Sequence, residues 1–329
     1  MIKFETILRK IGSWGIGYSE AIFMPIVNTT QPLTAQENQR VIEELCRTYP
    51  NCRTQVLIRT AFQRPVQTIV IGNGPRKVLF TAAHHANEWI TGLILLKFAE
   101  ELAQAIEQDG QIFGRSAREL AKQVTVYMVP VVNPDGIDLV TGAVKPGDIQ
   151  YDLAQRLAQN YPSIPFPDGW KANLLGVDLN LNYPAGWLQA REIKFSQGFV
   201  TPGPRDYVGR APLNQLETNA LAGYTEELDP ALVLAFHSQG KEIYWTFQDY
   251  EVPGARELGE KFAQASGYRL TEPAFNSSFA GYKDWFIQNF RRPGYTIEVG
   301  QGVNPLPISQ FDEIYRDNLG ILVIAAFGE

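Results

Sequence analysis

Runs of apolar residues alternate along this chain with segments of helical periodicity. The apolar runs predict five buried strands, over residues 66–71, 78–83, 124–132, 232–236 and 296–299. Helical spacing and cap residues predict helices that follow Thr34 towards Arg47, start at Glu88, and span residues 255–267 and 308–326. Alternating strands and helices imply an α/β fold, in which helices cover both faces of a sheet.

Polar, turn-forming groups stand where four of these predicted strands end. They are His85, the cluster Asn133-Pro134-Asp135-Gly136, the cluster His237-Ser238-Gln239-Gly240, and Glu298. In open α/β sheets the ligand crevice lies outside the carboxyl ends of the strands. In a largely parallel sheet we therefore expect these groups along one rim.

The histidines make this rim a candidate metal site. The chain has three of them, His84, His85 and His237. His85 and Glu88 are three residues apart at a strand–helix junction and can face one point. They provide two of the three protein ligands of a His₂Glu catalytic zinc, and His237 is then the third. A buried, hydrogen-bonded histidine at a strand end is the alternative. The shared rim favours the metal, and His84 is interpreted as structural.

Composition limits the partners and the number of domains. The chain has 329 residues, of which 45% are hydrophobic and 19% charged, as in ordinary globular proteins. Its formal net charge of −6 argues against nucleic acid or an anionic membrane as the main partner. We expect one domain over residues 36–329, behind a polar, irregular N-terminal extension over residues 1–35.

Neither cysteine usage nor apolar stretches indicate secretion. Cys46 and Cys52 do not make a secreted disulfide framework, and we expect free thiols. The first ten residues carry charges inside what would be the apolar core of a signal peptide. No apolar stretch approaches the roughly 20 residues of a membrane span. The expected location is therefore cytoplasmic.

Five motifs together resemble, in order, those of the zinc metallocarboxypeptidase family. They are His85-Ala86-Asn87-Glu88-Trp89-Ile90, Asn133-Pro134-Asp135-Gly136, Gly176-Val177-Asp178-Leu179-Asn180, His237-Ser238 and Thr296-Ile297-Glu298-Val299. The similarity runs from about residue 60 to the C-terminus. It implies one zinc ion held by His85, Glu88 and His237, with Glu298 as general base. It also implies a three-layer α/β/α sandwich around a mixed, mostly parallel sheet of about eight strands.

The chemistry of such a site suits these residue types. Zinc polarises a carbonyl and acidifies water, and a nearby carboxylate such as Glu298 can move the proton. Ion pairing of Glu298 with Arg291 or Arg292 is the structural alternative. Lys171 stands where the family places an oxyanion-stabilising arginine, and a lysine can serve as a point charge. The alternative for Lys171 is a solvated loop cation. Asp178 is expected to hold a turn.

One departure from the family pattern concerns the substrate. In typical family members an arginine that grips the C-terminal carboxylate follows the residue equivalent to Asn180, whereas this chain has Leu181. Leucine cannot pair with a carboxylate. Four arginines are available to replace this anchor: Arg205, Arg210, Arg291 and Arg292. The family's mobile tyrosine would fall near Asn276, and Tyr282 is the nearest candidate for that substrate contact.

The segments around Asn180, Glu298 and Asn304 look like one bacterial branch of the family. That branch is the γ-D-glutamyl-L-diamino acid endopeptidases, which cut peptidoglycan peptides between γ-D-Glu and diaminopimelate or lysine. We therefore expect a zinc peptidase acting on murein peptides, with Asn180 and Leu181 in the substrate site. Two alternatives stay open: a conventional carboxypeptidase with a displaced carboxylate anchor, and a non-catalytic relative that binds peptides. The oligomeric state is left open.

Overall fold

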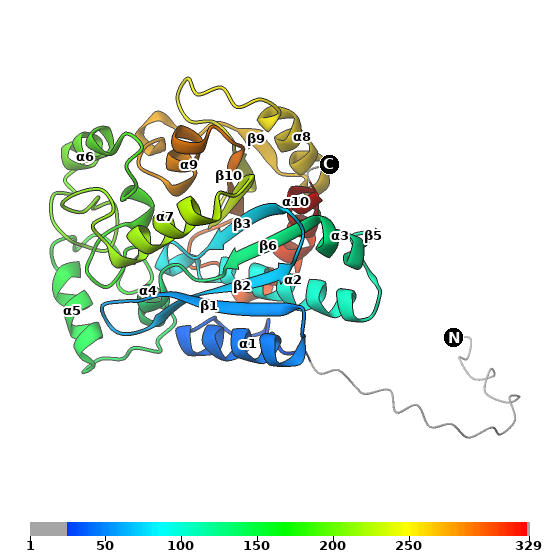
Figure 1. The fold of residues 1–329 in the computed structure, drawn as a ribbon. Coiled ribbons are helices and arrows are strands. Elements are labelled where there is room, and N and C mark those ends of the chain that lie inside the picture. The colour runs from blue at the N-terminus through cyan, green and yellow to red at the C-terminus, as the bar shows by residue number, and fades with distance from the viewer. Residues whose placement is uncertain (1–24, 328–329) are drawn as a thin grey trace, which may run out of the picture.

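A single eight-stranded sheet forms the centre of the fold (Figure 1). The computed structural model describes residues 25–327. The strand order is β1-β2-β6-β3-β7-β10-β8-β9. Their bounds are β1 Cys52–Arg59, β2 Pro65–Gly72, β3 Arg76–Ala82, β6 Val124–Val129, β7 Leu232–Ser238, β8 Glu242–Tyr244, β9 Arg269–Thr271 and β10 Gly294–Val299. Four of the seven pairings are parallel, which confirms the expected mixed, mostly parallel sheet.

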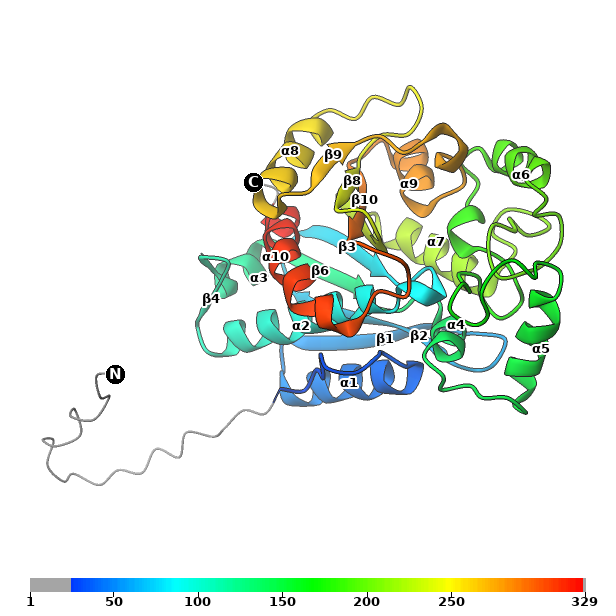
Figure 2. The same ribbon diagram turned by 180° about the vertical axis from the view of Figure 1, so that it is seen from behind.

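Helices cover both faces of this sheet (Figures 1 and 2). One layer contains α1 Ala35–Thr48, α2 Ile90–Glu107, α3 Ala117–Gln123, α8 Ala255–Ser266 and α10 Phe311–Phe327. The opposite layer contains α6 Trp187–Ser196, α7 Leu216–Leu228 and α9 Tyr282–Phe290. The other elements within residues 25–327 are the helices α4 Pro134–Val140 and α5 Ile149–Ala158 and the ribbon of β4 Gln111–Ile112 and β5 Arg115–Ser116. The same residues also form short 3₁₀ turns, η1 Ala86–Glu88, η2 Leu179–Leu181, η3 Phe275–Ser277 and η4 Ile308–Gln310.

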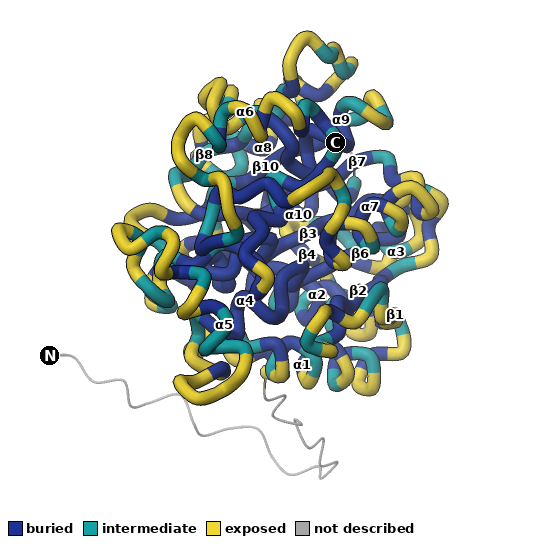
Figure 3. Tube along the Cα trace, turned by 90° about the vertical axis from the view of Figure 1, so that its left-hand side faces the viewer, coloured by how far each residue is buried: buried dark blue, intermediate teal, exposed yellow. Residues whose placement is uncertain are grey.

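The central strands are buried on both faces. On β3, Phe80 packs with the α2 layer, whereas its neighbour Leu79 packs with the α7 layer. Successive side chains of a strand point to opposite faces, so both must be apolar when both faces are covered. The buried part of the chain accordingly runs through the middle of the molecule, and exposed residues lie at its periphery (Figure 3).

The predicted strands and helices are found, with shifts at their ends. Thr34 caps α1, and its side chain accepts a hydrogen bond from Glu37 N. Glu88, the predicted start of the next helix, is instead the last residue of the 3₁₀ turn η1, and α2 starts two residues later at Ile90. Edge strand β1 and the three-residue strands β8 and β9 were not predicted. Most of β1 is exposed or half-buried, and β8 and β9 are too short for a periodicity to appear.

Two residues of the predicted N-terminal extension pack with the domain that follows it. Val27 and Leu33 are buried in the core, whereas the residues between them are exposed or half-buried. The extension approaches α2 at Gly92, where an added Cβ would lie 2.7 Å from Leu33 Cδ2. Residues 1–24 of the predicted extension lie outside the described residues.

Two other expectations concern the thiols and the membrane. Cys46 and Cys52 are free thiols, as expected, with their sulfur atoms 2.7 Å apart. Within residues 25–327, none of the helices combines the length and apolar character needed to cross a membrane.

Four adjacent strands, β6, β3, β7 and β10, run parallel to one another. Their carboxyl ends therefore share one edge of the sheet. In the register between β7 and β10, His237 is the direct partner of Glu298. The polar groups that follow these strands lie at this edge, as the chain order predicted.

Candidate metal centre

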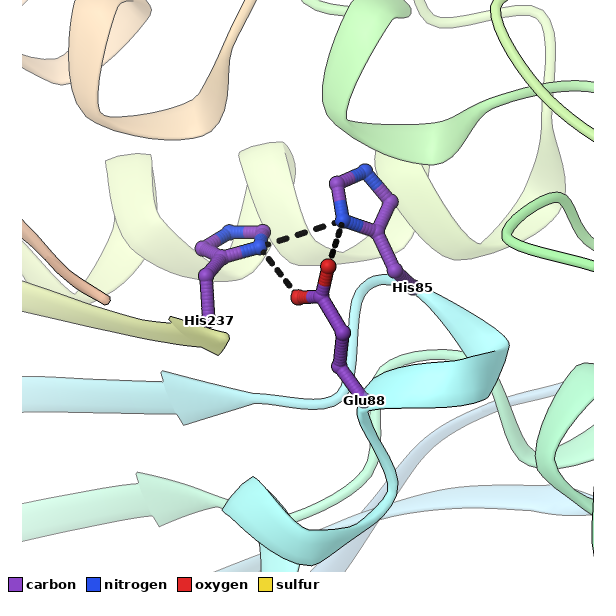
Figure 4. Close-up of side chains that lie close together, drawn as sticks. All are labelled: His85, Glu88 and His237. Atoms are coloured by element: carbon purple, nitrogen blue, oxygen red, sulfur yellow. Dashed lines mark hydrogen bonds and ion pairs between the residues drawn. The ribbon is translucent and has the colours of Figure 1, made fainter. Parts of the chain in front are cut away.

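Two imidazoles and one carboxylate converge at this edge of the sheet (Figure 4). Glu88 Oε1 lies 2.9 Å from His85 Nδ1, and Glu88 Oε2 lies 2.9 Å from His237 Nδ1. The two Nδ1 atoms are 3.3 Å apart. One ligand atom from each residue can be chosen so that all lie within 4.8 Å of one another. The three residues predicted to hold zinc are therefore brought together.

A short turn explains why His85 and Glu88 face the same point. Strand β3 ends at Ala82, and Ala83 adopts a left-handed φ of 49°, which turns the chain out of the sheet. Residues 86–88 then form a 3₁₀ turn that His85 precedes as N-cap. Side chains three residues apart eclipse one another in a 3₁₀ helix, so the imidazole and the carboxylate lie side by side.

Asp178 determines which nitrogen of His85 is available. His85 Nε2 lies 3.0 Å from Asp178 Oδ1. An ionised carboxylate only accepts hydrogen bonds, so Nε2 carries a proton in this contact. In the neutral ring, Nδ1 then directs a lone pair towards the oxygens of Glu88. A cation would satisfy these converging lone pairs, and a carboxylate on the far nitrogen is the usual outer partner of a metal-bound histidine.

The electrostatics differ between the two imidazoles, because burial lowers the pKa of His237 whereas the pKa of His85 is raised. Burial disfavours a charged imidazole, yet the carboxylates of Glu88 and Asp178 raise the pKa of His85 to about 9. Burial likewise opposes ionisation of Glu88, but His85 and Lys171 hold the pKa of this carboxyl well below its usual range. With two imidazoles and a carboxylate, the donor set fits zinc, whose protein ligands are nitrogen, sulfur and oxygen atoms.

His84 has a different place, as predicted. Its side chain is fully buried, and its ring stacks on His237 with centroids 5.6 Å apart. His84 Nε2 lies 3.2 Å from the hydroxyl of Tyr183. Burial lowers the pKa of His84 well below its ordinary value, so its ring is neutral. His84 supports the ring of a candidate ligand and does not belong to the cluster.

Glu298 lies beside the cluster at the cavity wall. Burial and then the charge of Glu88 raise the pKa of Glu298 to about 8. Neither arginine proposed as its structural partner pairs with it. Arg292 binds Asp229, with Nη1 and Oδ1 2.7 Å apart, and Arg291 lies over the ring of Tyr250. The ion-pair interpretation of Glu298 is therefore wrong.

Lys171 is not a solvated loop cation either. Its Nζ lies 3.1 Å from Glu88 Oε1, and its side chain is only 19% exposed. The carbonyl of Lys171 accepts a hydrogen bond from Ala86 N, so this segment is tied to the turn that carries the cluster. Burial lowers the pKa of Lys171, but the carboxylates of Glu88, Asp178 and Glu298 together outweigh burial, so the net shift of this pKa is upward. Its ammonium group therefore stays charged beside the cluster.

A cavity of about 1040 Å³ opens over the cluster. Asn180 and Leu181, predicted to meet the substrate, both line it. Asn180 Oδ1 accepts a hydrogen bond from Tyr282 N, which anchors the turn of Asn180 to the start of α9. The cavity therefore contains the predicted metal ligands, Glu298 and the position where the carboxylate-binding arginine is missing.

The expectation for Tyr282 is wrong. Its side chain is fully buried and does not line the cavity. Its hydroxyl lies 2.8 Å from Thr225 Oγ1, and its ring contacts those of His84, Tyr183 and Trp285. Tyr282 is the first residue of α9, on the side that packs against the sheet. Residues 273, 274 and 277 border the cavity instead, in the segment where the family's tyrosine was expected.

Two features of the cavity were not predicted. Asp178 holds a turn, as expected, through Asn180 N, but it also contacts His85. Asp206 N donates a hydrogen bond to Asp178 Oδ2, and this brings Arg205 to the cavity wall. No local pattern marks these contacts, because they join segments that are distant in the sequence.

Comparisons with known proteins agree with this geometry. The family described as zinc carboxypeptidase matches residues 39–320. Gamma-D-glutamyl-L-diamino acid endopeptidase 1 of Lysinibacillus sphaericus is 41% identical over 302 residues, which cover 92% of this chain and 74% of that protein.

Solved structures share the fold at lower identity. Bovine thrombin-activatable fibrinolysis inhibitor is 17% identical, with a TM-score of 0.69 and coverage of 91% of this chain and 98% of the other. Murein-tripeptide amidase MpaA from Escherichia coli O157 is 20% identical, with a TM-score of 0.51 and coverage of 82% of this chain and 91% of the other.

Proposed function

Since this chain belongs to the zinc carboxypeptidase family and is a zinc metallopeptidase, we propose that it hydrolyses the γ-D-glutamyl-L-diamino acid bond of peptidoglycan peptides. The observation that carries the substrate is the 41% identity, over 92% of the chain, to an endopeptidase named for that bond. The diamino acid is meso-diaminopimelate or lysine. The family implies zinc, and the three convergent side chains provide a place for it.

In this proposal His85, Glu88 and His237 hold one zinc ion per chain. Zinc supplies a Lewis acid that polarises the scissile carbonyl and acidifies a water molecule. Glu298 takes the proton of the attacking water and passes it to the leaving nitrogen. Lys171 presents its charged Nζ to the oxygen on which negative charge develops. Its placement 3.1 Å from Glu88 Oε1 supports this role, because the substrate carbonyl must approach the same point.

Leu181 supports an endopeptidase rather than a carboxypeptidase. It lines the cavity at the position where typical family members carry the carboxylate-binding arginine. An aliphatic side chain offers no donor to a terminal carboxylate. The enzyme therefore has no group at this position that requires a free chain end.

A comparison of three peptides tests the proposed substrate. We expect L-Ala-γ-D-Glu-meso-diaminopimelate and its C-terminal amide to be cut at the γ-D-Glu bond at similar rates, because nothing at position 181 binds the terminal charge. A matched α-linked L-peptide with a free C-terminus should be a poor substrate. Products are identified by mass spectrometry. Trimming of the L-peptide, together with inactivity towards the amide, would instead show a carboxypeptidase with a displaced anchor.

Asp178→Asn tests the orientation of His85. The asparagine amide is neutral, so it stabilises the tautomer of His85 with the proton on Nε2 less than the carboxylate does. Zinc affinity should therefore fall about 10- to 100-fold. Competition with a chromogenic chelator measures the affinity. Asp249→Asn, an exposed carboxylate on a loop, is the matched control and should bind zinc as the wild type does. An unchanged affinity in Asp178→Asn would reduce this residue to a turn former.

A further inference from the structure

We propose that Arg205 binds the free α-carboxylate of the γ-D-glutamyl residue of the substrate. This inference rests on the proposed function and adds the group that selects the acyl side of the scissile bond. It follows from the position of Arg205, from its unused hydrogen-bond donors and from the chemistry of a γ-linked glutamate.

Arg205 differs from the other cations that line the cavity in the donors that it keeps available after pairing with a carboxylate. The other cations are Lys171, Lys194 and Lys283. Each of the three lysines is paired with a carboxylate, that of Glu88, Asp206 or Asp284. Arg205 donates to Asp206 through Nε, at 2.7 Å, and its terminal Nη groups bind nothing in the described part of the chain. Its side chain is 39% exposed, so this pair of donors is available to a ligand.

The backbone holds Arg205 close to the reaction centre. The carbonyl of Pro204 accepts hydrogen bonds from the amides of Lys171 and Ala172, at 2.7 and 2.9 Å. On the other side of Arg205, Asp206 N donates to Asp178 Oδ2 at 3.2 Å. The same Asp178 carboxylate contacts His85. Arg205 is thus tied by main-chain contacts to both the candidate oxyanion lysine and the partner of a candidate metal ligand.

Asp206 also positions the guanidinium itself. Its carboxylate lies between Lys194 Nζ, at 2.6 Å from Oδ1, and Arg205 Nε, at 2.7 Å from Oδ2. With Nε held in this way, the two Nη groups still form a fork of parallel donors. Such a fork matches the two oxygens of a carboxylate, which is the bidentate geometry that arginine recognises.

A γ-linked glutamate presents a free α-carboxylate, whereas the α-carboxyl of an α-linked residue is part of the peptide bond. The peptide chain continues through the side chain, so the α-carboxylate branches off on the acyl side of the scissile bond. Standard bond lengths place it on the order of 5 Å from the scissile carbonyl carbon. A cation beside the catalytic groups can therefore reach it while the carbonyl sits at the metal.

The other arginines considered as replacement anchors do not reach the cavity. Arg291 and Arg292 are engaged with Tyr250 and Asp229. Arg210 is exposed and is not among the residues that line the cavity. Of the four, Arg205 alone lines it, which makes Arg210 a matched control from the same segment.

The test compares L-Ala-γ-D-Glu-meso-diaminopimelate with the analogue whose glutamyl α-carboxylate is an amide. The wild type should prefer the acid by about 10- to 100-fold in kcat/KM, as expected for a charge-assisted bidentate pair. Arg205→Gln should lose this factor on the acid and keep its rate on the amide. Arg205→Lys should recover part of the preference, because it retains the charge without the fork. Arg210→Gln should behave as the wild type does.

Two outcomes would overturn the assignment. If Arg205→Gln slows both peptides equally, the residue has only a structural role. If the wild type instead prefers a free C-terminus to a C-terminal amide, and Arg205→Gln removes this preference, Arg205 is a displaced anchor for the terminal carboxylate. Failure of the proposed function looks different, because the wild type would then cut neither γ-linked peptide. Calorimetric titration of the uncut tripeptide into Glu298→Gln, with and without Arg205→Gln, should show the same loss in affinity.

Discussion

Replacing His237 by alanine is expected to remove bound zinc and hydrolysis together, and His85→Ala should do the same. The candidate centre has three protein ligands, so the loss of one leaves two, which is too few for a stable zinc site. The fall in affinity should exceed the roughly 10- to 100-fold cost of losing an outer partner. Elemental analysis after gel filtration should give about one zinc per wild-type chain and little in either variant.

Removal and return of the metal provide the control. The wild type should lose activity when dialysed against a chelator and regain it when zinc is added, whereas the variants should not recover. Circular dichroism should confirm that they remain folded. Full zinc occupancy in both variants would refute the ligand assignment.

Glu298→Gln is expected to keep the fold and the zinc while hydrolysis falls about 10²- to 10⁴-fold, as is typical when a general base is removed. The amide has nearly the same shape but cannot accept the proton of water. Glu298 contacts the cavity rather than the core, so little packing is lost. Turnover numbers under saturating substrate, together with zinc content, measure the effect.

Glu242→Gln is a matched control for this variant. Glu242 is the register partner of Glu298 on β8, but its carboxylate pairs with Arg269 and Tyr244 and does not line the cavity. It should retain turnover close to that of the wild type. Wild-type turnover in Glu298→Gln would mean that another carboxylate serves as base.

The local pattern of apolar residues was sufficient to predict the central strands of this fold. Strands β3 and β7 were predictable because the helical layers bury both of their faces, and this requires consecutive apolar residues. Edge strand β1 escaped prediction because most of its residues are exposed or half-buried, and burial is what produces a strong pattern. The burial of Leu33 escaped prediction for a related reason, since it is a single aliphatic residue between Pro32 and Thr34.

The convergence of the candidate ligands was also predictable from the sequence. His85 and Glu88 are neighbours on one turn, and His237 and Glu298 end strands of an α/β sheet, whose carboxyl ends meet at one edge. The short sequence separation of His85 and Glu88, together with the topology of the sheet, is sufficient for that inference. The sequence also has Leu181 in place of an arginine. Because leucine cannot bind a terminal carboxylate, this residue indicates that the substrate is recognised on the acyl side of the scissile bond.

Only the tertiary structure decided the remaining roles. Tyr282 looks like an available tyrosine in the sequence, yet α9 packs it into the core against Thr225. Arg205 is one of four possible arginines until the hydrogen bond between Asp206 N and Asp178 places it at the cavity. The direction of a side chain depends on how distant segments pack and pair, and such contacts leave no periodicity in the sequence.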